Sequence, residues 1–188
     1  MLSSAFHLFS LRELPWSRFH FPRWQALLGL ALIAVLAGFD PVLRAAFPGM
    51  AHMPALSFGM AVASSALCIL VCTSIIVGFL RWWMQRGGRW DGQGDLFNLF
   101  VASGLVANIL SAGLIAVGMP ILTMLPLWLY AFWVSGNALS GAIPKASLAY
   151  SIGGSVISLI SALIVYGLAM VLIGLTLGSL DVALPFLQ

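Results

Sequence analysis

The feature that most constrains this chain is a series of five long apolar runs, none of which contains Asp, Glu, Lys or Arg. A bilayer core of about 30 Å is crossed by roughly 20 helical residues, so each run has the length, or nearly the length, of a membrane span. The predicted spans cover residues 24–39, 56–80, 96–119, 121–139 and 148–177. We therefore predict an all-α, polytopic integral membrane protein with five transmembrane helices in one domain of residues 24–180.

The composition excludes a water-soluble protein. Hydrophobic residues make up 62% of the chain and charged residues only 7%, whereas soluble domains carry about 25% charged residues. The mean hydropathy of +1.08 agrees. The net charge is +3, but eight basic residues are too few to form the basic stripe of a nucleic-acid-binding protein. We expect the lipid bilayer as the partner, and no nucleic acid.

The positions of the basic residues predict the orientation in the membrane. Seven of the eight lie in the N-terminal segment, the second connection or the fourth connection, and Arg44 alone lies in the first connection. Cytoplasmic loops carry the excess of Lys and Arg, so we predict a cytoplasmic N-terminus and a short outer tail of residues 181–188. The seven residues are Arg12, Arg18, Arg23, Arg81, Arg86, Arg89 and Lys145.

Residues 1–23 are predicted to form a cytoplasmic, interfacial, amphipathic arm. Leu2, Ala5, Phe6 and Phe9 follow helical spacing, and Pro15 ends the pattern. Aromatic and basic residues then alternate up to the first span, which is typical of a segment lying among lipid head groups. An arm that binds a partner protein is the open alternative.

The string Gly92–Gln93–Gly94–Asp95 reproduces the G-x-G-D pattern of intramembrane aspartyl proteases. That chemistry needs two carboxylates that share a proton, and none of the predicted spans supplies a second Asp. Asp91 is separated from Asp95 by two glycines in the connection. We therefore expect no enzymatic activity, and we expect Asp95 to cap the third predicted span.

The second connection combines Arg81, Arg86 and Arg89 with three tryptophans. The G-x-x-x-x-G-K-[ST] phosphate loop is absent, and Arg with Trp beside a span is typical of anchoring among anionic head groups. The residues expected to contact head groups or partner proteins are Arg81, Arg86, Arg89, Asp95 and Lys145.

No metal and no cofactor are predicted. Cys68 and Cys72 lie one helical turn apart, but two ligands do not complete a metal site. Met50, His52 and Met53 carry side chains that suit copper, but their Pro- and Gly-rich connection favours an incidental grouping.

Two asparagines, Asn108 and Asn137, lie within predicted spans. Polar groups at bilayer depth are costly and tend to be functional, so a transporter or channel component with a polar path around Asn108 is the alternative function. A solvent-connected cavity lined by Asn108, Ser111 and Asn137 would favour transport, whereas dry packing of these residues would exclude it. Small residues such as Ser103 and Ser111 on one helix face also suit close helix packing.

Several short motifs resemble the Yip-domain family, five-pass membrane proteins named for their interaction with Ypt/Rab GTPases. The motifs are Gly87–Gly88, Gly92, Gly94 and Phe97, then Trp128 and Tyr130, then Pro144–Lys145–Ala146. The resemblance covers about residues 81–177. It implies a five-span fold with a cytoplasmic N-terminus.

The chain also departs from that family, because no D-L-Y-G-P-type motif precedes the first span. The family's GTPase-binding role is therefore not carried over, and the chain resembles a compact, bacterial-type member with a fold but no established activity. This resemblance implies a bacterial inner membrane as the location. We expect a non-catalytic membrane protein that organises the membrane or docks partners, including other membrane proteins or further copies of itself.

Overall fold

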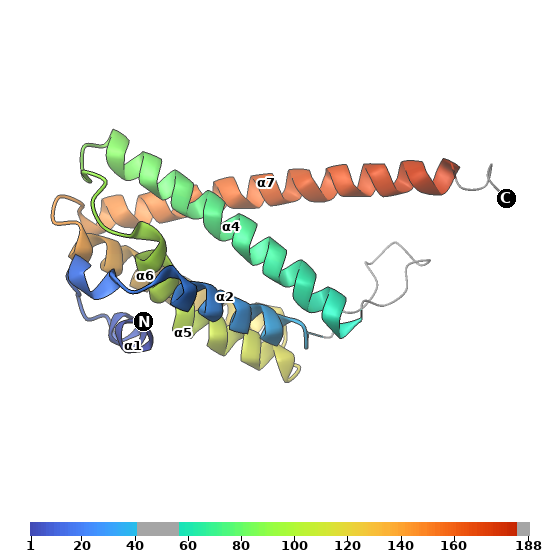
Figure 1. Ribbon diagram of the computed structural model, residues 1–188, viewed down its shortest axis with the longest axis horizontal. Coiled ribbons are helices and arrows are strands. Elements are labelled where there is room, and N and C mark those ends of the chain that lie inside the picture. The colour runs from blue at the N-terminus through green and yellow to red at the C-terminus, as the bar shows by residue number, and fades with distance from the viewer. Residues whose placement is uncertain (41–56, 184–188) are drawn as a thin grey trace.

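The computed structural model describes residues 1–40 and 57–183, and every regular element within them is helical (Figure 1). The predicted all-α fold is confirmed for this part of the chain. Arg44, the Met50–His52–Met53 group and the last residues of the predicted outer tail lie outside it. The elements are α1 (Leu2–Phe9), η1 (Trp16–Phe19), α2 (Arg23–Ala37), α4 (Phe58–Arg86), α5 (Leu96–Ala116), η2 (Ile121–Met124), α6 (Leu125–Ala142) and α7 (Leu148–Ala183).

Four helical segments are long and apolar enough to cross a membrane: α4, α5, Ile121–Ala142, and Leu148–Val165 within α7. This supports a helical integral membrane protein. The first predicted span forms α2, which has only 15 residues and is therefore about 22 Å long. That length is less than the thickness of the hydrocarbon core, so the number of five spans remains a prediction. The orientation in the membrane also remains a prediction.

The helix ends differ from the predicted span ends for local reasons. Helix α4 continues past Leu80 to Arg86, because Arg and Trp are compatible with helix even where they leave the hydrocarbon. The fourth predicted span begins as the short 3-10 helix η2, and Pro126 lies in the first turn of α6. A proline there lacks only an N–H that the helix would not use.

The helices pack as a bundle in which α5 contacts α2, α4 and α6, and α7 contacts α4 and α6. One glycine lets α2 and α5 lie close together, because a Cβ at Gly29 would lie 2.7 Å from Leu105 Cδ1. Helix packing in membranes relies on such small residues. One buried cluster includes Leu80, Met84 and Leu139, and joins α4, α5 and α6 to the connections at one end of the bundle.

The N-terminal arm is packed into the bundle. Helix α1 contacts α5 and α6, and it buries Ser4, Ala5 and Leu8. Of the residues used to predict its apolar face, Leu2 and Phe6 are about 60% exposed. The packed face of the helix is therefore rotated from the predicted one, and Leu2 and Phe6 lie on its exposed side.

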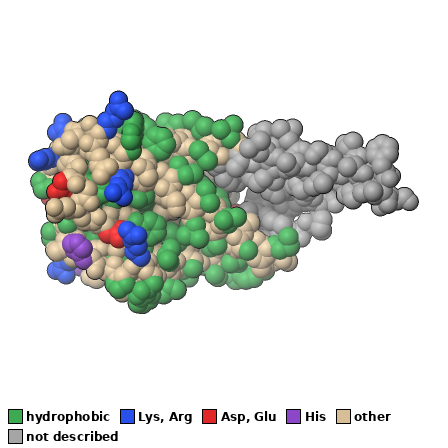
Figure 2. All heavy atoms as spheres, turned by 45° about the horizontal axis from the view of Figure 1, so that its top comes forward, with side chains coloured by type: hydrophobic (Ala, Val, Ile, Leu, Met, Phe, Trp, Pro, Cys, Tyr) green, Lys and Arg blue, Asp and Glu red, His purple; other side chains and the backbone are tan. Residues whose placement is uncertain are grey.

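Within the part of the chain that the structure describes, most charged side chains gather at one end (Figure 2). We call this the loop end, formed by residues 10–22, 87–95 and 143–147. Arg23 Nε donates to Asp95 Oδ2 at 2.8 Å, and an Arg89 guanidinium N–H donates to the Lys145 carbonyl at 2.9 Å. The arm, the second connection and the fourth connection therefore share one end, as the distribution of basic residues predicts.

Candidate functional site

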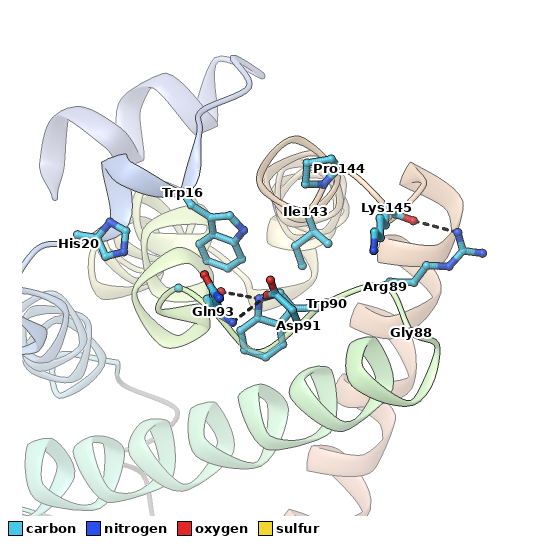
Figure 3. Close-up of a pocket in the computed structure, with 11 residues that line it drawn as sticks. Trp16, His20, Gly88, Arg89, Trp90, Asp91, Gln93, Ile143, Pro144 and Lys145 are labelled. Carbon is cyan, nitrogen blue, oxygen red and sulfur yellow. Dashed lines mark hydrogen bonds between the residues drawn. The ribbon is translucent and has the colours of Figure 1, made fainter.

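A pocket of about 410 Å³ lies at the loop end, where the α4–α5 and α6–α7 connections meet the arm (Figure 3). We call it the loop-end pocket. It brings together motifs that are distant in sequence, since Gly88 and Gly94 line it together with Pro144 and Lys145. Its lining residues are Trp16, His20, Gly88, Arg89, Trp90, Asp91, Gln93, Gly94, Ile143, Pro144 and Lys145.

Glycine is needed where the second connection turns against the arm. Gly94 has a φ of +92°, a conformation that residues with a Cβ rarely adopt. A Cβ at this position would also lie 2.8 Å from the Trp16 ring. Gly94 of the G-x-G-D string therefore shapes the turn and leaves room for the Trp16 ring.

Two tryptophans form the aromatic wall of the pocket. The rings of Trp16 and Trp90 stack with centroids 6.1 Å apart and planes inclined by 23°. The Trp90 indole N–H donates to the Gln93 carbonyl at 2.6 Å, so the ring is held in place by its own connection. Stacked rings with a polar edge suit the boundary between hydrocarbon and water.

The pocket carries two cations and one carboxylate. Arg89 and Lys145 are both exposed, and the Arg89 guanidinium lies 5.4 Å from the centroid of the Tyr150 ring while it bonds to the Lys145 carbonyl. Asp91 Oδ1 accepts a hydrogen bond from the Gln93 backbone N–H at 2.9 Å, which occupies one of its oxygens within the loop. Two positive side chains and one negative side chain leave the pocket with a net positive charge, which favours a ligand with an anionic group.

The other predicted contact residues lie outside this pocket. Arg86 stacks over Trp82 with its guanidinium 5.3 Å from the ring centroid, and Arg81 is exposed on α4. Asp95 is the N-cap of α5, as predicted: its Oδ1 accepts from the Asn98 backbone N–H at 3.2 Å. Its other oxygen pairs with Arg23, so both carboxylate oxygens have structural partners.

The sequence did not identify Asn98 as the residue that fastens the arm. Asn98 is buried, and its Nδ2 donates to the carbonyls of Phe19 and Phe21 at 2.9 and 2.6 Å. This contact fixes the part of the arm that carries Trp16 and His20 over α5, together with the packing of α1 and of the buried Phe19. No local signal in the sequence indicates such a long-range bond.

A second cavity, of about 490 Å³, lies between the long helices. We call it the mid-bundle cavity. Asn108 lines it, whereas Ser111 and Asn137 are not among its lining residues: Ser111 donates to the Asn108 carbonyl and Asn137 to the Trp133 carbonyl. The three residues therefore neither line one cavity together, as expected for a transporter, nor all pack away from a cavity, as expected for a protein that does not transport. The lining residues are Leu30, Ile33, Ile69, Cys72, Thr73, Ile76, Phe100, Val101, Gly104, Asn108, Trp128, Ala131, Phe132, Ser135, Ser155, Leu159 and Leu163.

Within residues 1–40 and 57–183, no group of three or more His, Cys, Asp or Glu side chains could hold a metal ion. No family model, no curated protein and no solved structure matches this chain.

Proposed function

We propose that this chain is a non-catalytic integral membrane protein that binds the phosphate of lipid head groups in the loop-end pocket and thereby organises the surrounding membrane. The observation that carries the proposal is the meeting of Arg89 and Lys145 beside the stacked pair of Trp16 and Trp90. Arg and Lys are the side chains that recognise phosphate, and tryptophan anchors at the level of the head groups.

Three further features support this proposal. The pocket lies at the charged end of an otherwise apolar bundle, where head groups would lie if the four long helices cross the bilayer. The excess of basic residues at this end favours the cytoplasmic side. The segments that resemble the Yip-domain family also supply Gly88, Gly94, Pro144 and Lys145 to the pocket. We therefore propose both that the chain is of the Yip-like type and that these segments form its binding site.

The proposal can be tested by native mass spectrometry of the full chain in detergent. The probes are dioleoyl phosphatidylglycerol, phosphatidylethanolamine and diacylglycerol, which differ in charge and in the presence of phosphate. We expect both phospholipids to be retained over diacylglycerol. Arg89→Gln and Lys145→Gln should each weaken that retention about tenfold, the factor of one hydrogen bond to a charged group.

Arg81→Gln is the matched control, because Arg81 is also exposed beside a tryptophan but does not line the pocket. Inorganic phosphate added as a competitor distinguishes a site for free phosphate from one that needs the lipid. Equal loss of phospholipid in Arg81→Gln and Arg89→Gln would refute a specific site. Stronger retention of phosphatidylethanolamine than phosphatidylglycerol would show that Asp91 helps to select the head group.

A further inference from the structure

The mid-bundle cavity lies among apolar helical segments, with walls from α2, α4, α5, α6 and α7. Its volume of about 490 Å³ lies within the range of sites for small organic molecules. Phe100, Trp128 and Phe132 form an aromatic part of the wall, and no charged residue is among the residues lining it. A charged ligand would therefore have no counter-ion here.

Four polar side chains in the wall differ in whether they are paired. The Ser135 hydroxyl shares a hydrogen bond with that of Ser103 at 3.0 Å, and the Ser155 hydroxyl donates to the Ser151 carbonyl at 3.0 Å. In the described part of the chain, neither the Thr73 hydroxyl nor the Asn108 side-chain amide has a hydrogen-bond partner. Both unpaired groups face the same cavity.

The Thr73 hydroxyl has no partner, as is also the case for the buried hydroxyl of Ser151. Hydroxyl groups in helices commonly bond to the carbonyl four residues earlier, and Ser74, Ser158 and Ser161 all do so. Thr73 does not, although it is only 7% exposed. Asn108 is exposed on the cavity side of α5, and polar groups that face hydrocarbon gain free energy from a hydrogen-bond partner, so a partner at this place is favoured.

We propose that the mid-bundle cavity binds an uncharged, lipid-soluble molecule that carries a hydroxyl or carbonyl group. Its apolar body packs against Phe100, Trp128 and Phe132, and its polar group bonds to Thr73 and Asn108. An amide and a hydroxyl both donate and accept, so either ligand group finds a complementary partner. This inference is independent of head-group binding at the loop end.

The test uses the full chain in decyl maltoside micelles and a matched pair of probes, 12-bromododecan-1-ol and 1-bromododecane. Bromine quenches tryptophan fluorescence on contact, and the difference between the wild type and Trp128→Phe isolates the signal of Trp128. We expect the alcohol to quench Trp128 at a mole fraction in the micelle about 3- to 10-fold lower than the alkane needs, the factor of one hydrogen bond.

Thr73→Val and Asn108→Leu should bring the alcohol to the behaviour of the alkane, and Ala131→Phe should remove the quenching by both probes because it fills the cavity. Asn137→Leu is the control, since Asn137 bonds to the carbonyl of Trp133 in its own helix and does not line the cavity. Equal quenching by the two probes in the wild type would show an unselective space for acyl chains and overturn the proposal. Quenching by neither, or wild-type quenching in Ala131→Phe, would overturn it as well.

Discussion

At the scale of single residues, one buried amide fastens the last part of the arm to α5. Asn98→Leu removes two hydrogen bonds and leaves the carbonyls of Phe19 and Phe21 without their donor. Each lost partner of a buried group costs about 1–3 kcal/mol, so we expect a loss of about 2–5 kcal/mol in the free energy of unfolding. Chemical denaturation in detergent, followed by circular dichroism, measures it.

Asn137→Leu serves as the control for this prediction, because its amide bonds only within α6. It should change the free energy of unfolding by about 1 kcal/mol or less. If the two variants were equally stable, the arm would not depend on Asn98.

The same two residues of α5 show how far single residues can be predicted. Asp95 was predicted as a cap because a cap acts within one helical turn, so sequence spacing contains the information. Asn98 lies three residues further on, but its partners are 77 and 79 positions away in the chain. Such a contact follows from tertiary packing, and no motif in the chain indicates it. The pairing of Arg89 with Lys145 was missed for the same reason, although both residues were selected individually.

At the scale of elements, the end of α4 packs closely on α7 because Gly87 has no side chain. A Cβ at Gly87 would clash with the hydroxyl of Tyr150, which donates to the Trp83 carbonyl at 2.8 Å. We expect Gly87→Ala to displace Tyr150 and to lower the free energy of unfolding by about 1–3 kcal/mol. Thermal unfolding of the detergent-solubilised protein measures the change.

The control is Gly78→Ala in the same helix, where nothing lies within 4 Å of the added Cβ. It should be neutral or slightly stabilising, because alanine favours helix over glycine by about 0.5–1 kcal/mol. In the Tyr150→Leu background the clash is relieved, so Gly87→Ala should cost less than in the wild type. Additive effects in the double variant would contradict the close approach.

At the start of α5, Asp95 both caps the helix and pairs with Arg23, and two substitutions separate these contributions. Asp95→Asn keeps a good N-cap and loses only the exposed ion pair with Arg23, whose side chain is 71% exposed. It should therefore cost less than about 1 kcal/mol, whereas Asp95→Ala also loses the cap and should cost about 1 kcal/mol more. Denaturant unfolding of both variants measures the difference. Equal stabilities would show that the cap contributes nothing.

The existence of the helices was easier to predict than their ends. Apolar runs without charge identify the spans because hydrocarbon excludes charge, and this holds for α4, α5, α6 and α7. The ends depend on local chemistry instead: α4 continues six residues beyond Leu80 to Arg86, and α6 follows a 3-10 turn at Ile121–Met124. Hydropathy reports where the membrane ends, and a helix can continue beyond that point.

At the scale of the whole molecule, the path of α2 decides between four and five spans. Arg23, at its start, pairs with Asp95 at the loop end, whereas Phe39, just beyond its end, packs on Phe58 at the start of α4 with ring centroids 4.7 Å apart. Since α4 then runs back to Arg86 at the loop end (Figure 1), α2 traverses the bundle despite its 15 residues. A short span is accommodated by thinning the bilayer or by polar flanking residues.

Single cysteines in a Cys68→Ala/Cys72→Ala background test this path with a membrane-impermeant maleimide. Phe39→Cys and Val117→Cys should be labelled in intact cells, because α2 and α5 both end away from the loop end, and Val117 is 79% exposed. Gln93→Cys should be labelled only after lysis, since the excess of basic residues is expected on the cytoplasmic side. Labelling of Phe39→Cys only after lysis, with Val117→Cys unchanged, would mean that α2 does not cross. Labelling of Gln93→Cys in intact cells would reverse the orientation and place the loop-end pocket on the outer face.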